Sequence, residues 1–326
     1  MSSSLPGARP LPESRYDLST YLGRVRHAAA IADMRTLFTS AQTLEQSKQI
    51  LTQYKSGQIK EMNEDLWQAK KIVDSTLHPD TGQPVLLPFR MSAFVLTNLV
   101  VTAGMLTPNL RTRGTLFWQI TNQSLNVAIN TSNANKSHPL STQKLLTSYA
   151  LAVSASCSVA LGLNALVPRL KRISPATRIV LGRLVPFAAV ASAGVLNVFL
   201  MRAEEIRHGI DVFAAGDDGK EVLGQSRRAA TIAVGETALS RVINATPIMV
   251  LPPLVLLRLQ KTKLLAARPG LTLPVNLALI LGVSVFALPI ALGVFPARER
   301  VSARWVEEEF REKVGNDGEV EFNRGL

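Results

Sequence analysis

Five long stretches without a charged residue dominate residues 91–296 of this 326-residue chain. They cover residues 91–108, 145–168, 185–201, 242–257 and 271–296, and the fourth extends back to residue 234 if two charged residues are tolerated. A bilayer core needs about 20 apolar residues of helix. Buried helices of a large soluble protein are the alternative, but five such stretches so close together favour membrane spans. The sequence therefore predicts an all-α polytopic membrane protein with about five transmembrane helices.

This prediction divides the chain into three parts. Residues 1–90 are expected to form a soluble helical region, in which residues 1–14, rich in Ser and Pro, are expected to be disordered. Residues 297–326 are expected to form a short charged C-terminal tail. The membrane domain, residues 91–296, has predicted spans at about 91–108, 145–168, 185–201, 234–257 and 271–296.

Within the N-terminal region, Asn63 is a candidate N-cap, because an Asn side chain can accept from the first free N–H groups of a helix. The apolar residues that follow share one helical face, and the helix should end before Pro79. These apolar residues are Leu66, Ala69, Val73 and Leu77.

Composition excludes several classes of protein. Only 18% of the residues are charged, against about 25% in soluble proteins, and the net charge of +12 comes from short basic clusters between apolar runs. With three Trp and four Tyr available for base stacking, nucleic acid is not an expected partner. Cys157 is the one cysteine, and the four His are scattered. No disulfide, metal site, cofactor or enzymatic nucleophile–base pair is expected.

The charges of the loops predict an orientation. The loops after the second and fourth runs contain basic but no acidic residues, whereas the loop after the third and the C-terminal tail are rich in acidic residues. Under the positive-inside rule, five spans place the basic loops and the N-terminus on the inner side and the C-terminus outside. The segment 109–144 is the exception, because it carries four basic residues and no acidic ones on the predicted outer side.

An uncharged segment rich in amides, residues 115–133, is the strongest candidate for a solute site. On a helix its Asn residues form one polar stripe, which suits a neutral or zwitterionic solute. The alternatives are a helix that spans, re-enters or lies flat at the interface, and hydrogen bonding to a neighbouring helix. The candidate residues are Asn122, Gln123, Asn126, Asn130 and Asn133.

Two charged residues near the weak fourth run, Glu236 and Arg241, are further candidates for solute binding, because charges at bilayer depth usually face the interior of a bundle. They could instead precede the helix and stay in water. Prolines in the apolar runs could also break helices and free backbone groups for binding. The segment His78, Pro79, Asp80, Thr81 and Gly82 has the chemistry of a structural turn.

Several of these motifs, taken in order, resemble the sideroflexins. The similarity rests on the turn at 78–82, on 90–93, on the amide segment from Phe117 to Asn133, and on 161–166, 185–187 and 322–326. Residues 209–212, 236–239, 251–253 and 267–269 resemble the fifth, tricarboxylate-carrier-like branch. Thr131 departs from the usual tyrosine beside the Asn stripe.

The resemblance implies a multi-pass protein of the mitochondrial inner membrane. It implies transport of serine, and of other small amino acids, into the matrix to support one-carbon metabolism, with the N-terminus in the matrix and the C-terminus in the intermembrane space. The branch name implies citrate instead. A neutral stripe favours serine, since citrate should require several Arg or Lys. A non-transporting assembly or scaffold protein remains an alternative, and association with further copies of the chain is left open.

Overall fold

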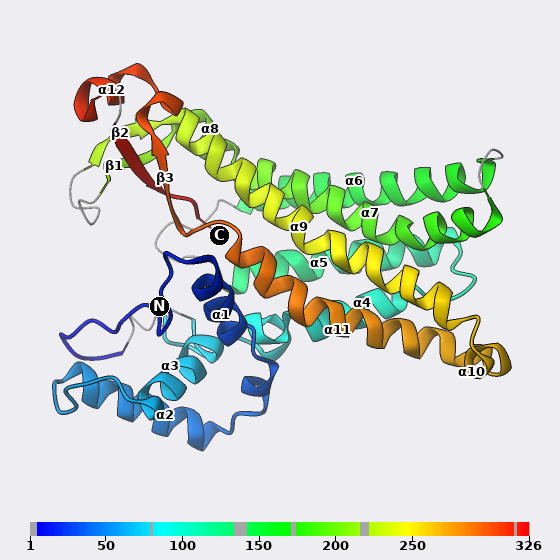
Figure 1. Cartoon of the computed structure of the whole chain (residues 1–326), viewed down its shortest axis with the longest axis horizontal. Helices are drawn as coiled ribbons and strands as arrows, with labels where there is room; N and C mark the ends of the chain where they lie inside the picture. The colour runs from blue at the N-terminus through cyan, green and yellow to red at the C-terminus, as the bar shows by residue number, and fades with distance from the viewer. Residues whose placement is uncertain are drawn as a thin grey trace.

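The computed structural model describes residues 5–78, 81–133, 142–170, 174–215, 222–315 and 318–325. Its centre is a bundle of roughly parallel and antiparallel helices, with smaller elements gathered at one end (Figure 1). The helices of the bundle are α4 (Phe94–Met105), α5 (Thr112–Asn133), α6 (Thr142–Leu166), α7 (Pro175–Met201), α9 (Arg227–Leu259) and α11 (Thr272–Gly293).

Four of these helices, α6, α7, α9 and α11, are long and apolar enough to cross a membrane. Only 17% to 33% of their most apolar windows is buried inside the protein. So much exposed apolar surface would be unstable in water and is natural in lipid. The predicted class, an all-α polytopic membrane protein, is confirmed.

The predicted first span, residues 91–108, forms a shorter helix than expected. After the 3₁₀ turn η3 (Met91–Ala93), α4 has 12 residues and ends at Met105. At 1.5 Å per residue it is about 18 Å long, short of the roughly 30 Å apolar core. The sequence Thr107-Pro108 stops it, because proline disfavours helical geometry in the residue before it.

Successive helices of the bundle are antiparallel, so it has two chemically distinct ends. The basic end carries exposed cations from three connections: Arg111 and Arg113, Arg169, and Arg258, Lys261, Lys263 and Arg268. It includes α10 (Lys263–Ala267). The sheet end carries the strands and the N-terminal helices (Figure 1).

The N-terminal region and the C-terminal segment lie at the same end. Arg24 of α1 (Tyr21–Ile31) donates from Nε to the carbonyl of Gly293 at the end of α11, over 2.9 Å. A Cβ on Gly293 would meet Val25 at 2.6 Å, so glycine is what permits this approach. The prediction that the termini lie on opposite sides is therefore wrong. It failed because α5 was not counted as a helix running the length of the bundle.

The N-terminal region contains α1, η1 (Met34–Phe38), α2 (Ala41–Lys55) and α3 (Glu64–Thr76). Asn63 caps α3 as predicted, since its Oδ1 accepts from the N–H of Leu66 at 2.9 Å. The predicted apolar face is buried between α3 and α2. Residues 5–14, expected to be disordered, instead pack on α2, with Arg9 over the Tyr54 ring at 4.3 Å.

A four-stranded antiparallel sheet, which the sequence did not indicate, stands at the sheet end. It combines the connection between α7 and α9 with the C-terminal tail, in the order β2-β1-β4-β3. The side chains of Val212, Phe310 and Phe322 form its core with the first turns of α9. The elements are β1 (Ile210–Ala214), β2 (Val222–Ser226), β3 (Arg298–Ser302), β4 (Glu319–Asn323), α8 (Ala203–His208) and α12 (Glu308–Val314).

The remaining short 3₁₀ helices are η2 (Leu87–Phe89), η4 (Val167–Arg169), η5 (Pro269–Leu271) and η6 (Ala303–Trp305). Because the sheet encloses the first turns of α9, part of that 33-residue helix lies outside the apolar bundle. The tail predicted at 297–326 is therefore a folded part of a small domain.

Candidate functional site

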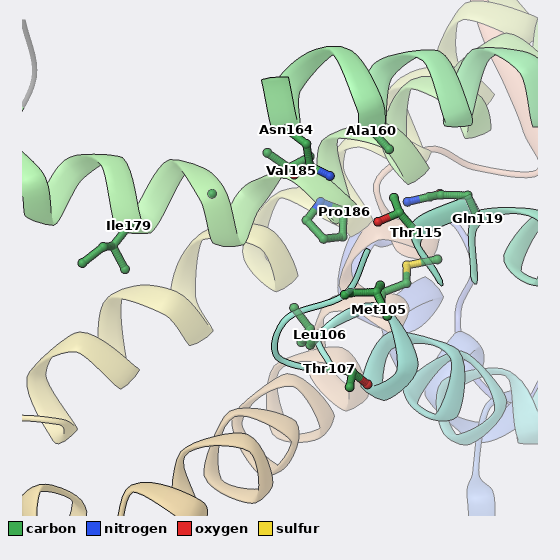
Figure 2. A pocket seen from close by; sticks show the side chains of 12 residues that line it. Met105, Leu106, Thr107, Thr115, Gln119, Ala160, Asn164, Ile179, Val185 and Pro186 are labelled. Atoms are coloured by element: carbon green, nitrogen blue, oxygen red, sulfur yellow. The ribbon is translucent and has the colours of Figure 1, made fainter. Parts of the chain in front are cut away.

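A cavity of about 270 Å³ lies between α4, α5, α6 and α7, toward the basic end (Figure 2). Next to the cavity α4 packs closely against α5: a Cβ on Gly104 would lie 2.0 Å from the Trp118 ring, so only glycine fits. The lining residues are Met105, Leu106, Thr107, Leu110, Thr115, Gln119, Ala160, Asn164, Ile179, Gly182, Val185 and Pro186.

These twelve lining residues include no Asp, Glu, Lys or Arg. The polar groups are the side chains of Thr107, Thr115, Gln119 and Asn164, set among apolar ones. Gln119 is 1% exposed, and its Oε1 accepts a hydrogen bond from the Ser156 hydroxyl at 2.5 Å. With the oxygen occupied, the amide NH₂ group remains as a donor beside the cavity. The cavity can therefore offer neutral donors and acceptors.

A break in the hydrogen bonds of α7 adds a backbone acceptor. Pro186 lies inside α7 and has no N–H, so the carbonyl of Gly182 loses its usual partner four residues on. Both residues line the cavity, and Pro186 lies opposite Thr115 and Met105 in Figure 2. Freed backbone groups beside a cavity are a recurring way for membrane transporters to bind solutes.

Helix α5 has its polar face inside and its apolar face outside. Gln119, Asn122 and Gln123 are at most 4% exposed, whereas Phe117 is 59% and Ile120 42% exposed. This arrangement would be unfavourable in water and is favourable in lipid. At 22 residues, about 33 Å, α5 is long enough to cross a bilayer although it is too polar to be recognised by hydropathy.

Two hydrogen bonds show that α5 runs antiparallel to α6 rather than lying across the bundle. Gln119 meets Ser156, and Ser124 meets Tyr149 at 2.9 Å. The residue numbers rise on one helix as they fall on the other. Of the three arrangements left open for this segment, the structure fits a helix that spans.

The predicted Asn stripe is only partly described. Asn122 and Gln123 are buried, and the Asn122 Nδ2 and Gln123 Nε2 atoms have no partner among the described residues. Asn126 is half-buried, and the side chains of Asn130 and Asn133 lie outside the description. None of the five lines the cavity; Gln119, one turn before Asn122, does.

Glu236 and Arg241 lie apart from the cavity. Both belong to α9, which begins at Arg227, so the alternative that the helix starts after Arg241 is wrong. Glu236 is half-buried near the sheet end, and its Oε2 has no hydrogen-bond partner in the described parts of the chain. Arg241 is exposed.

The turn at residues 78–82 connects the N-terminal region to the bundle. The N–H of Gly82 donates to the carbonyl of His78 at 2.9 Å, and Gly82 has a φ of 65°, which glycine adopts without strain. Thr81 N–H donates to His78 Nδ1 at 3.4 Å. Pro79 and Asp80 lie outside the described residues. No group of three potential metal ligands occurs where the chain is described.

Sequence reasoning did not select Thr115, Asn164, Gly182 or Pro186 together, because they come from three helices far apart in the chain. Pro186 was recognised as a helix breaker, and that was the available signal. Fold and site together define a class: a polytopic helical membrane protein whose bundle encloses an uncharged polar cavity.

The comparisons with known proteins then give the family. A family model of the sideroflexins matches residues 10–326. Sideroflexin fsf1 of Schizosaccharomyces pombe is 62% identical over 97% of this chain and 98% of its own length. Sideroflexin FSF1 of Saccharomyces cerevisiae is 58% identical over the whole of both chains. Human sideroflexin-5 is 41% identical over 97% of this chain and 92% of its own. The chain belongs to the sideroflexin family, as the motifs predicted. No solved structure matches it.

Proposed function

We propose that this protein transports serine, and other small neutral or zwitterionic amino acids, across the mitochondrial inner membrane into the matrix, where serine feeds one-carbon metabolism. The observation that carries the proposal is the cavity between α4, α5, α6 and α7, which is polar and uncharged. Its volume of about 270 Å³ is just below the range typical of drug-sized ligands, so it suits a small metabolite.

The lining chemistry supports a zwitterion over a multiply charged anion. Amide N–H₂ groups of Gln119 and Asn164 can donate to a carboxylate, while the free Gly182 carbonyl and the Thr115 hydroxyl can accept from an ammonium or hydroxyl group. Net charge in such a site would be expensive, because no opposite charge offsets its desolvation.

Citrate is the second candidate, favoured by one specific feature. Arg111 and Arg113 follow Leu110 and precede Thr115, two lining residues, so two exposed cations stand at the basic end beside the cavity. They could draw an anion toward the mouth, but citrate inside the cavity would lack charged partners.

A third reading is an inner-membrane assembly or scaffold protein that transports nothing. The folded sheet domain and the N-terminal helices would supply its docking surfaces. Under this reading the cavity would be a packing defect.

The basic residues gathered at one end of the bundle support an orientation in which the N-terminus lies on the side of the membrane opposite to the predicted one. With α5 running the length of the bundle, Arg111 and Arg113 join the two basic loops at one end, which accounts for two of the four basic residues in the exceptional segment 109–144. The positive-inside rule then places the basic end in the matrix, and both the N-terminal region and the sheet in the intermembrane space. Protease digestion of mitoplasts, read with antibodies to both termini, tests this: cleavage of both supports it, and protection of either terminus contradicts it.

The deciding experiment is uptake of labelled serine and labelled citrate, side by side, into liposomes that contain the purified protein. We expect saturable serine uptake, competed by other small amino acids, and no citrate uptake. The variant Asn164→Leu should reduce serine uptake, whereas Ser124→Ala, on the same pair of helices but outside the cavity, should not. Citrate uptake alone would favour the second candidate, and uptake of neither by inserted, folded protein would favour the scaffold.

A further inference from the structure

The C-terminal segment ends inside the sheet end of the bundle. Strand β4 lies between β1 and β3, and it leads to Arg324 and Gly325, which lie beside Arg202 at the end of α7 and Ala297 just after α11. Arg324 is only 4% exposed, which is rare for an arginine. An arginine buried this deeply calls for a physical reason.

The backbone around Arg324 is tied at several points. Its N–H donates to the carbonyl of Ala297 at 2.9 Å, just after α11. The N–H of Gly325 donates to Asn323 Oδ1 at 3.0 Å, and Gly325 has a φ of 71°, where a side chain would be strained and would lie 3.1 Å from Arg202.

The guanidinium of Arg324 stands in a cluster of charges from several elements. It lies 5.6 Å from the centre of the Phe295 ring and interacts electrostatically with Glu236 of α9 and Glu299 of β3. Glu236 and Glu299 also repel each other. Each of the three side chains keeps one buried polar atom without a hydrogen-bond partner among the described residues: Arg324 Nε, Glu236 Oε2 and Glu299 Oε2.

The other cations nearby are already engaged. Arg202, at the end of α7, binds Glu205 through 2.5 and 3.0 Å contacts and donates to Thr237 at 3.0 Å. Arg24 donates to backbone carbonyls at the end of α11. Arg24 also attracts Glu299, but Arg324 is the cation that interacts with both Glu236 and Glu299, and through them it links α9 to the segment after α11.

We propose that the C-terminal segment is a lock that closes the sheet end of the bundle, in which the buried Arg324 cation balances the charges of Glu236 and Glu299. The cavity lies toward the basic end, on the far side of the bundle from this lock. Opening the sheet end requires the helix ends to separate, and the three incompletely bonded charges make that separation less costly than for a fully bonded cluster. This inference rests on the proposed transport function.

The test uses two reporter cysteines in full-length protein in nanodiscs, after the one native cysteine is replaced by Cys157→Ser. The first reporter is Ser240→Cys. Ser240 lies one turn after Glu236 on α9 and is 8% exposed, so labelling at this position shows that the probe has passed the lock. Thr115→Cys lines the cavity and serves as the matched control. A bulky, water-soluble maleimide is the probe.

With Arg324→Gln, we expect labelling at position 240 to rise about tenfold or more, because Glu236 and Glu299 then repel each other without a cation between them. Labelling at position 115 should not rise. Arg324→Lys should restore slow labelling, and so should the triple variant Arg324→Gln, Glu236→Gln, Glu299→Gln, which removes the repulsion as well.

Unchanged labelling at position 240 in Arg324→Gln and in a variant lacking residues 324–326 would overturn the lock. So would a parallel rise at both positions, which would indicate general loosening of the bundle. If the labelling behaves as expected but the wild type does not transport serine, the lock stands and the transport proposal fails. If the wild type transports serine and the labelling does not change, the transport proposal stands and the lock fails.

Discussion

The hydrogen bond between Gln119 and Ser156 makes a prediction that separates stability from transport. The bond joins α5 to α6 at the cavity, is 2.5 Å long, and both residues are at most 1% exposed. Ser156→Ala leaves the Gln119 amide oxygen buried without its donor. An unsatisfied buried polar group costs about 1–3 kcal/mol, so we expect a fall of a few degrees or more in the melting temperature.

Gln119→Leu should be milder for stability. Once its partner is gone, the Ser156 hydroxyl can turn to a carbonyl of its own helix, as Ser154 does with Ala150 at 2.8 Å. We therefore expect a loss of less than about 1 kcal/mol. For serine transport we expect the opposite order, with Gln119→Leu more impaired than Ser156→Ala. Losing a solute hydrogen bond worth about 0.5–1.5 kcal/mol weakens binding by roughly twofold to tenfold in Gln119→Leu, and by less in Ser156→Ala.

The assays are thermal unfolding in detergent and the concentration dependence of serine uptake into liposomes. Ser124→Ala is the matched control, because it removes the other hydrogen bond between α5 and α6, outside the cavity. The double variant Gln119→Leu, Ser156→Ala should regain near wild-type stability and still transport poorly. Normal uptake by Gln119→Leu would refute the placement of the solute beside Gln119.

Three further predictions follow from other parts of the protein. Pro186→Ala supplies an N–H for the Gly182 carbonyl, so serine uptake should fall in the liposome assay while the melting temperature holds or rises. Glu307 accepts from the hydroxyl and N–H groups at the start of α9, and these bonds outweigh burial and lower its pKa below its usual 4.5. Its stabilisation should be complete above pH 4.5 and lost as the pH falls through the folded-state pKa, so Glu307→Gln should cost about 0.5–2 kcal/mol in thermal unfolding at neutral pH and progressively less as the pH falls below 4.5. Gly293→Leu should displace α1, because its side chain would overlap Val25; faster proteolysis of the N-terminal region checks this, and an unchanged digestion pattern would contradict it.

Local sequence signals determined a good part of this structure. The uncharged runs produced α6, α7, α9 and α11, because the free energy of inserting a helix in lipid is nearly a sum over its own residues. Asn63 capped α3 as predicted, since a cap depends on residues three positions apart. The family followed from motifs that can be read in order along the chain.

The tertiary structure decided what depends on residues far apart. Hydropathy could not recognise α5, because it counts the amides as polar and cannot show that Gln119 meets Ser156 on another helix, and with α5 uncounted the two termini were predicted on opposite sides. The sheet pairs β1 with β4, strands about 110 residues apart, and neither partner has a strong signal alone. The cavity and the Arg324 cluster are likewise products of long-range packing: the sequence specifies which groups are polar, and only the fold decides which of them meet.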